Sequence, residues 1–263
     1  MAKSASQNTA KITTDRRPNL RAAQQRFLKS RKAEIEYARK LRSIAKQVGH
    51  IVQGFAPKGV VLNQEALLSS LRKYAEMITP WAKAVAKTML DDIARRNESM
   101  WSQMGEDVGR NLKAEIMMTP TGTLMAEALN EQVKLITSLP LEAAERVHGL
   151  VLIGLTDSTR AKQVAEDIMA TGEVTKSRAN LIARTEVSRV ATELTKARAT
   201  QVGLTHYIWR TSGDSDVRTS HKHMNGKVVA FNEPPEVEPG KFYHAGSFPN
   251  CRCYVEPIIP EED

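Results

Sequence analysis

The sequence predicts a mainly α-helical protein, with a long-helix body followed by a small α+β module at the C-terminus. Apolar residues recur at spacings of three and four over most of residues 21–203, which is the period of an amphipathic helix. The last 60 residues lack this period and are interrupted by Gly and Pro. Aromatic residues make up 5% of the 263 residues, fewer than an all-β protein of this length needs.

The first predicted helix runs from about residue 21 to residue 52. Its apolar face is formed by Phe27, Leu28, Ile35, Ala38, Leu41, Ile44, Ala45, Val48, Ile51 and Val52. A second helix is expected to begin near Asn63. The pair Thr79-Pro80 predicts the start of a third helix over residues 81–118, because a hydroxyl can cap a helix and Pro fits its first turn. Gly105 and Gly109 are expected to bend or split this helix.

Four further helices are predicted along the rest of the body, over residues 123–138, 141–154, 158–170 and 175–202. Pro140 is expected to separate the first two, because Pro breaks the interior of a helix. Gly203 is a typical C-terminal stop for the last one.

The C-terminal module, residues 204–259, is predicted to contain short strands. Residues 206–209, 227–231 and 253–256 are rich in β-branched and aromatic side chains. Turns are expected at residues 212–215 and at Asn225-Gly226. The predicted domain division is a basic, disordered tail of residues 1–20, a variable helical region of residues 21–160 and a C-terminal domain of residues 161–259.

The charge is concentrated in the N-terminal segment. Residues 1–50 hold 13 Lys and Arg against 3 Asp and Glu, whereas the remainder holds 25 against 27. A basic arm on a near-neutral body favours contact with nucleic acid or with an acidic protein surface. The residues expected to make this contact are Arg26, Lys29, Arg31, Lys32, Arg39, Lys40, Arg42 and Lys46. The alternative, strongest for residues 1–20, is a solvated tail without a partner.

Several protein classes are excluded. The longest uncharged apolar run, residues 149–155, is far shorter than the ~20 residues of a membrane-spanning helix. The first 20 residues contain no apolar stretch that would predict a signal peptide. Two cysteines cannot form a disulfide framework, so we expect a reducing compartment. Gly-rich phosphate loops, Gly-x-Ser-x-Gly and His-Glu-x-x-His are absent from the sequence.

The C-terminal module contains four of the six histidines and both cysteines. Nitrogen and sulfur ligands for a tetrahedral zinc ion can come from His221 or His223 together with His244, Cys251 and Cys253. In an extended strand, the side chains of a Cys-x-Cys or His-x-His pair point the same way. The alternative is ordinary packing without a metal. It would involve Trp209, Phe231, Phe242 and Tyr243, with ion pairs from Asp214 or Asp216 to Arg218.

A catalytic alternative is a metal-dependent nuclease or another DNA-processing enzyme that uses the His/Cys cluster. The order His221, Asn225, His244, Asn250 is loosely similar to that of the His-Asn-His nucleases. Those sites need a helix after the hairpin, and Pro257 disfavours one here. A second alternative is a non-specific DNA-binding protein that acts through the basic N-terminal segment.

Five sequence blocks together resemble the C-terminal domain of the phage Mu F-like head morphogenesis family, over about residues 160–257. The blocks are Ile182-Ala183-Arg184-Thr185-Glu186, Trp209, the stretch from Asp216 to His221, Asn225-Gly226 with the later Pro239-Gly240, and Pro249-Asn250-Cys251-Arg252-Cys253. The family residues that this resemblance marks are Arg184, Glu186, Trp209, Asp216, Arg218, His221, Gly226, Cys251 and Cys253.

The resemblance implies a minor head protein of a tailed phage, without enzymatic activity. Such a protein acts in head morphogenesis at the portal, is found in the virion head after assembly in the host cytoplasm, and has a role in DNA packaging or ejection. The partners implied are the portal protein, the major capsid or scaffolding protein, and double-stranded DNA bound without sequence specificity, but no membrane. No cofactor is implied beyond the zinc ion considered above.

Structural roles are expected for the family residues. Arg184 and Glu186 are each predicted to pair with the C-terminal module, around the turn from Asp216 to His221. His221 is predicted to anchor that turn by hydrogen bonds. Gly226 is predicted to take a positive φ in the Asn-Gly turn.

Overall fold

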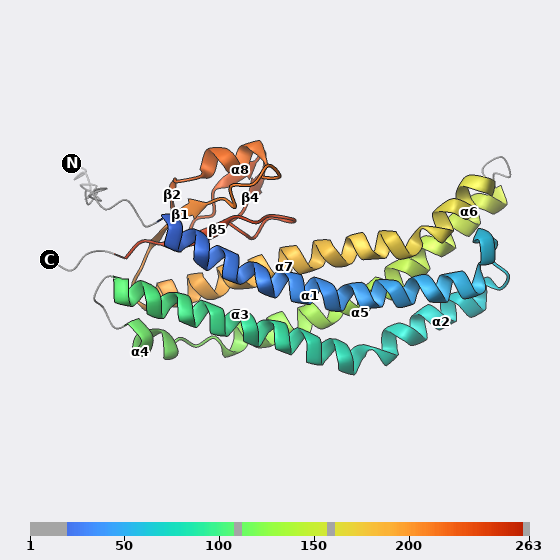
Figure 1. Ribbon diagram of the computed structural model, residues 1–263, viewed down its shortest axis with the longest axis horizontal. Coiled ribbons are helices and arrows are strands. Elements are labelled where there is room, and N and C mark those ends of the chain that lie inside the picture. The colour runs from blue at the N-terminus through green and yellow to red at the C-terminus, as the bar shows by residue number, and fades with distance from the viewer. Residues whose placement is uncertain (1–19, 108–111, 157–160, 260–263) are drawn as a thin grey trace, which may run out of the picture.

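The computed structural model describes residues 20–107, 112–156 and 161–259. Apart from Leu20, the predicted tail lies outside these residues. The described chain forms an elongated helical bundle with a small β-containing module at the end where the N-terminal helix begins (Figure 1). This arrangement confirms the predicted fold class. In the described ranges, no helix has both the length and the apolarity that crossing a bilayer requires.

The bundle is built from long helices that run side by side along its axis (Figure 1). Its elements are α1 (Leu20–Phe55), the 3₁₀ turn η1 (Pro57–Gly59), α2 (Gln64–Met77), α3 (Thr79–Asp107), α4 (Leu112–Met117), α5 (Gly122–Thr156), α6 (Ala161–Met169) and α7 (Thr171–Gln201). Helix α6 lies at the end of the bundle far from the C-terminal module.

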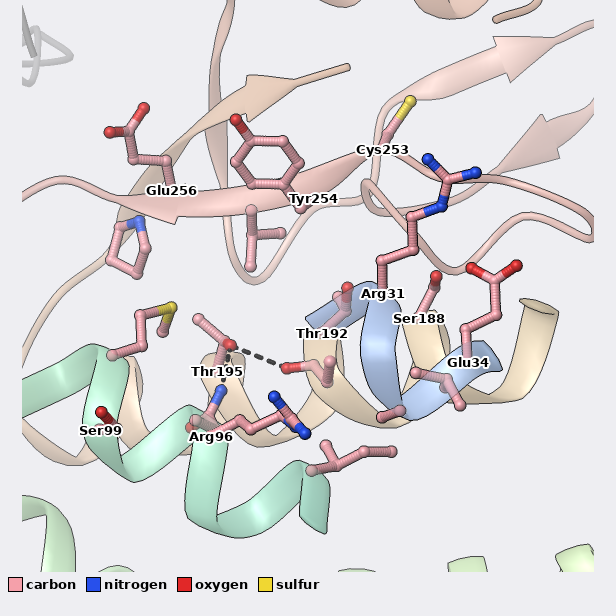
Figure 2. Close-up of a pocket in the computed structure, with 18 of the residues that line it drawn as sticks. Arg31, Glu34, Arg96, Ser99, Ser188, Thr192, Thr195, Cys253, Tyr254 and Glu256 are labelled. Carbon is pink, nitrogen blue, oxygen red and sulfur yellow. Dashed lines mark hydrogen bonds between the residues drawn. The ribbon is translucent and has the colours of Figure 1, made fainter. Parts of the chain in front are cut away.

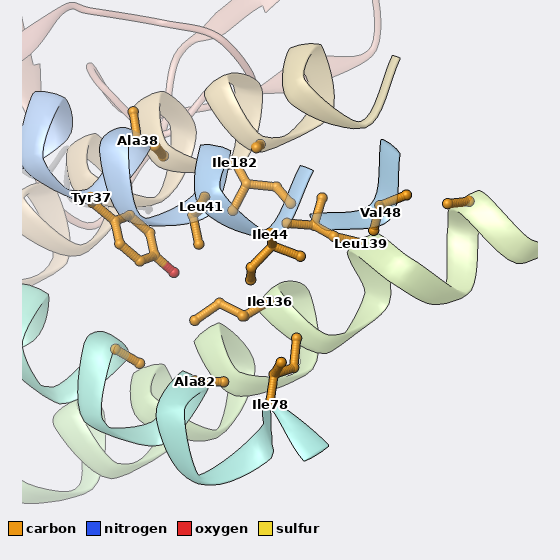
Figure 3. Close-up of a cluster of buried hydrophobic side chains, with 14 of the residues drawn as sticks. Tyr37, Ala38, Leu41, Ile44, Val48, Ile78, Ala82, Ile136, Leu139 and Ile182 are labelled. Carbon is orange, nitrogen blue, oxygen red and sulfur yellow. The ribbon is translucent and has the colours of Figure 1, made fainter. Parts of the chain in front are cut away.

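The apolar stripe predicted for α1 forms the centre of the bundle core. Leu41, Ile44 and Val48 are fully buried, and they face side chains of α5 and α7 (Figure 3). Burial of each such side chain contributes about 1.5–3 kcal/mol to folding. Ile35, which was assigned to the same stripe, is instead 53% exposed. The side chains of residues 20–30, including Phe27 and Leu28, lie outside the described part of the chain.

Both predicted helix starts are confirmed, but only one of them is capped by its side chain as expected. Asn63 caps α2, because its side-chain oxygen accepts a hydrogen bond from the Ala66 N–H over 2.9 Å. Thr79 does not cap α3: its hydroxyl donates backwards to the Ala75 carbonyl, 3.2 Å away. The predicted split at Gly109 lies outside the described residues, between α3 and α4.

The expected break at Pro140 is wrong. Helix α5 continues through this residue, although Pro cannot donate the usual hydrogen bond to the carbonyl of Ile136. Ile136 and Leu139, in the turn of α5 that precedes Pro140, are 0% and 1% exposed and are part of the bundle core (Figure 3). Burial of these flanking side chains offsets the cost of the missing hydrogen bond.

Helix α7 begins four residues earlier than predicted and packs along α1. The two helices approach closely where Gly49 meets Gly172: a Cβ on Gly172 would lie 3.0 Å from the Gly49 Cα. Gly203, with φ +77°, ends α7 as predicted. The Leu204 N–H donates to the Ala199 carbonyl over 2.8 Å, as in a Schellman motif.

The C-terminal module contains all three predicted strands. They form an antiparallel sheet in the order β2-β1-β5, in which Trp209 pairs with Val255. A six-residue helix and a short hairpin were not predicted. The elements of the module are β1 (His206–Arg210), α8 (Thr219–Met224), β2 (Val228–Ala230), β3 (Glu236–Glu238), β4 (Lys241–Phe242) and β5 (Tyr254–Pro257).

The module shares its core with the bundle. Trp209 and Phe231 are buried in it, as the packing alternative expected, whereas Phe242 is 57% exposed. Trp101 of α3 and Ile116 of α4 complete this core from outside the module. The predicted boundary at residue 160 stays a prediction, and helices on both sides of it contribute to one bundle core.

Candidate functional site

His221 is the centre of a buried cluster in the C-terminal module. It lies on α8 and is 1% exposed. The rings of Trp209 and Phe248 face it edge-on, with centroid distances of 5.6 and 5.4 Å. Phe248 in turn lies beneath the Arg218 guanidinium, whose carbon is 4.7 Å from the ring centroid. Three of the residues marked by the family resemblance, Trp209, His221 and Arg218, therefore form a chain of contacts that passes through Phe248.

The two cysteines approach the same histidine. The Nδ1 atom of His221 is 3.3 Å from the Cys251 Sγ and 3.5 Å from the Cys253 Sγ. The Cys253 backbone N–H donates to the Cys251 sulfur over 3.3 Å. Both thiols are 3% exposed. The structure thus brings together three of the four residues assigned to a zinc site.

His244 lies apart from this cluster. Its Nδ1 atom is 3.1 Å from the Tyr207 hydroxyl, and the ring is buried. Burial, reinforced by the charge of Lys196, lowers the pKa of His244 to about 4. His223 is exposed on α8. The idea that His221 and His223 share one face of a strand is wrong, because this segment is helical.

The pKa values of the two thiols are driven apart. Hydrogen bonds from the Cys253 thiol and the His221 ring to the Cys251 sulfur lower the pKa of Cys251, although burial opposes the change. The same Cys251–Cys253 hydrogen bond, together with burial, raises the pKa of Cys253. Of the two thiols, Cys251 therefore has the lower pKa.

The Arg-Thr pair on α7 holds the loop that carries the cysteines. The Nη1 atom of Arg184 donates to the Asn250 Oδ1 over 2.8 Å. The Thr185 hydroxyl accepts from the Asn250 N–H over 2.9 Å. Asn250 has φ +60°, a conformation that Asn tolerates better than most residues. Arg184 therefore pairs with the module as predicted, but at the cysteine loop rather than at the turn before His221.

The prediction for Glu186 is wrong. This carboxylate is buried in the bundle, where it accepts a 2.6 Å hydrogen bond from Gln132 and two hydrogen bonds from Arg189. Gln132 also accepts a hydrogen bond from the Tyr37 hydroxyl. The network joins α1, α5 and α7, so Glu186 orders the bundle instead of docking the module.

The acidic residues before His221 pair with a different arginine than expected. Arg252 lies between the cysteines in sequence, and its guanidinium contacts Asp214 at 2.6 Å and Asp216 at 3.5 Å. Arg218, the expected partner, donates instead to the Pro249 carbonyl over 3.2 Å. Both arginines thereby tie the segment around α8 to the cysteine loop.

Gly226 has φ +85°, which confirms the predicted positive φ. Asn225 precedes it with φ −59° and ψ 123°, and the Lys227 N–H donates to the Met224 carbonyl over 3.0 Å. This geometry is a type II turn, which requires glycine or asparagine at its third position. The turn leads from α8 into β2.

Most of the basic residues assigned to partner contact lie on the exposed side of α1. Arg31, Lys32, Arg39, Lys40 and Lys46 are exposed. Arg39 also forms an ion pair with Glu36. Arg42 is half-buried and donates to Asn180 of α7, so it holds the bundle together. The side chains of Arg26 and Lys29 lie outside the described residues.

A mostly apolar cavity of about 150 Å³ lies where α1, α3 and α7 meet β5 (Figure 2). Thr195 projects into it and accepts a 2.7 Å hydrogen bond from Asn97. Cys253 contributes to the wall, while its sulfur points away from the α3 side (Figure 2). Sequence reasoning missed this cavity because its walls come from four segments that are far apart in the chain.

Comparison with known proteins matches the C-terminal part of the chain to a family. Residues 145–256 match the family model described as "Phage Mu protein F like protein", which confirms the resemblance over that segment.

Longer similarities extend over most of the chain. An uncharacterized protein of Haemophilus influenzae is 26% identical over 249 residues, which cover 89% of this chain and 55% of that protein. The minor head protein GP7 of Bacillus phage SPP1 is 22% identical over 254 residues, which cover 86% of this chain and 80% of GP7. The chain therefore spans just over half the length of the Haemophilus relative. No solved structure gives a significant match.

Proposed function

We propose that this chain, whose residues 145–256 are phage Mu F-like, is a minor head protein of a tailed phage. It acts in head morphogenesis at or near the portal and stays in the virion head. The similarity to minor head protein GP7 along most of both chains supports this role. That similarity carries the proposal, and the structure adds that Trp209, Arg218 and His221 contact one another or Phe248 inside the module.

The same observation supports a role without catalysis. A general acid or base must come within hydrogen-bond reach of its substrate. His221 is 1% exposed and contacts two aromatic rings, and both cysteines beside it are buried. A long nucleic acid cannot approach these groups without unfolding the module. The nuclease alternative is therefore disfavoured.

The exposed face of α1 supplies a surface for an acidic partner. Lys32, Arg39 and Lys46 are seven residues apart, so they align on one face at intervals of roughly 10 Å. Glu36 is the acidic residue beside them. We name Lys32, Arg39, Lys40 and Lys46 the α1 basic stripe. It contacts packaged DNA or an acidic surface of the portal, capsid or scaffolding protein.

The head assignment is tested by mass spectrometry of purified heads from a phage that encodes this chain. We expect the chain in heads at low copy number, and co-purification with the portal protein from infected cells. Absence from both heads and portal complexes would refute the proposal.

The partner of the basic stripe is tested by a charge-reversal triple variant, Lys32→Glu with Arg39→Glu and Lys46→Glu. A matched control reverses Lys83, Lys134 and Lys162, which are exposed elsewhere on the bundle. If the stripe binds DNA, the first variant loses retention on duplex DNA, and the dependence of log K on log salt flattens by up to ~0.9 per lost phosphate contact. Equal loss in both variants contradicts a role for the stripe. Unchanged DNA retention with lost portal co-purification assigns the stripe to a protein partner.

A further inference from the structure

We infer that His221, Cys251 and Cys253 bind one zinc ion, which links α8 to the loop before β5. The inference rests on the arrangement of these three side chains and is independent of the role in the phage head. In the described part of the chain, they form a group whose ligand atoms all lie within 4.8 Å of one another. His244, the fourth residue considered for a metal, contacts Tyr207 instead.

The two nitrogen–sulfur distances agree with those of a tetrahedral zinc site. With Zn–S bonds of about 2.3 Å and Zn–N bonds of about 2.0–2.1 Å, tetrahedral angles place sulfur and nitrogen about 3.5 Å apart. The observed separations from the His221 Nδ1 to the two sulfurs are 3.3 and 3.5 Å. A single ion can therefore be shared by all three side chains, whose ligand atoms lie within 4.8 Å of one another.

The donor set selects the class of metal. Two thiolates and an imidazole suit zinc, whereas magnesium and calcium require oxygen ligands. The Cys253 N–H that donates to the Cys251 sulfur is a suitable outer-shell partner, because it stabilises negative charge on a coordinating thiolate. The rings of Trp209 and Phe248 contact the imidazole edge-on and restrict its orientation.

Burial makes the role structural. The three side chains are 1–3% exposed, so a substrate cannot reach the ion. The described residues supply three of the four ligands of a tetrahedral ion. The link closes a segment of about 30 residues between α8 and the cysteines, and the strands of this module are only two to five residues long. A metal link is a common way to stabilise such a small, loop-rich unit.

The test is the metal content of the full chain purified under reducing conditions without added chelator. We expect about one zinc per chain, measured by inductively coupled plasma mass spectrometry. His221→Ala is expected to reduce bound zinc at least tenfold. The control is His223→Ala, which removes an exposed histidine two positions along the same helix and is expected to keep the zinc.

Because His221→Ala can also unfold the module, the unmodified chain provides a second measurement. After removal of zinc, titration with Co²⁺ is expected to give the thiolate-to-cobalt charge-transfer absorption and the strong visible bands of a tetrahedral site, saturating at one cobalt per chain. Substoichiometric zinc together with no thiolate-to-cobalt absorption would overturn the proposal. A disulfide between Cys251 and Cys253 in the freshly isolated, unreduced chain would overturn it as well.

Discussion

Arg184 donates a hydrogen bond to Asn250 across 66 residues of sequence, and the 2.8 Å contact joins the long helix α7 to the loop that carries both cysteines. The same guanidinium also contacts Glu34 of α1 at 3.3 Å. One side chain therefore connects the first helix, the seventh helix and the C-terminal module. This position explains why an arginine on a helix belongs to the same motif as the distant cysteines.

Replacing Arg184 by Ala is expected to lower the free energy of unfolding by about 1–2 kcal/mol, because a charged hydrogen bond and a partly buried ion pair are lost. Arg178→Ala is the control, since its ion pair with Glu142 involves side chains that are 40% and 43% exposed. Exposed pairs contribute about 0–1 kcal/mol. Urea unfolding measures both, and equal losses would show that Arg184 has no special role.

Gly246 is expected to tolerate no side chain. It has φ +87°, and an added Cβ would lie 2.8 Å from the Thr192 hydroxyl and 2.9 Å from the Cys253 carbonyl oxygen. We expect Gly246→Ala to destabilise the protein by about 3 kcal/mol or more, from left-handed strain and overpacking.

Gly226→Ala is the matched comparison, because Gly226 has φ +85° but open space around its Cα. Strain alone should cost about 1–2 kcal/mol there. The difference between the two variants in chemical unfolding measures the close packing of Gly246 against Thr192 of α7 and the Cys253 carbonyl. If Gly226→Ala costs as much as Gly246→Ala, the close contact is not the cause.

The helix crossing at Gly172 predicts a reversal of the usual effect of alanine. Alanine normally stabilises a helix interior by about 0.5–1 kcal/mol relative to glycine. That gain is expected for Gly149→Ala on α5, where an added Cβ meets no atom within 4 Å. At Gly172 the Cβ would press on the backbone of Gly49, so we expect Gly172→Ala to destabilise by about 1–2 kcal/mol. Thermal melting of both variants would show opposite shifts, and shifts of the same sign would contradict the close packing of α1 and α7.

His244 is expected to make stability depend on pH below neutrality. Its pKa is about 4 in the folded protein, because burial disfavours the charged ring, against about 6.5 in an unfolded chain. The unfolded state therefore binds more protons between these values, and stability falls as pH decreases from about 6.5 towards 4. The contribution of His244 to this loss is about 2 kcal/mol, discounted for partial solvent access.

Urea unfolding at about pH 7 and about pH 4.5 measures the dependence. His244→Asn removes the titrating ring, so it should reduce the difference in unfolding free energy between the two pH values, even though it costs stability at both. An unchanged difference in the variant would assign the acid sensitivity to other groups.

Local patterns predicted the elements whose formation depends on neighbouring residues. The stripe through Leu41, Ile44 and Val48 indicates a helix by its period alone, and Asn63 indicates a helix start by its capping chemistry. The strand around Trp209 was predicted from its residue types. In each case the residues that form the pattern belong to the predicted helix or strand itself, or lie next to it in the sequence.

Structure that depends on distant partners was not predicted. Pro140 carries a strong local signal against helix, and the burial of Ile136 and Leu139 in the core overrides it. Helix α8 has only six residues, and only His221 and Met224 among them are buried. Two buried positions are too few to show the apolar spacing by which a helix is predicted from sequence. Glu186 was misplaced because its partner Gln132 lies 54 residues away, and no local pattern reports such a pairing.

Helix α7 belongs to two cores at once: Ile182 packs in the bundle, whereas Ala199 packs beneath the module. Residues 145–256 cut out alone would retain α7 but would lose α1 and Trp101. The segment that matches the family model therefore shares both cores with helices that precede it in the chain. Any helix that took the place of α1 would have to keep a small residue at position 49, because Gly172 leaves little room for a side chain there.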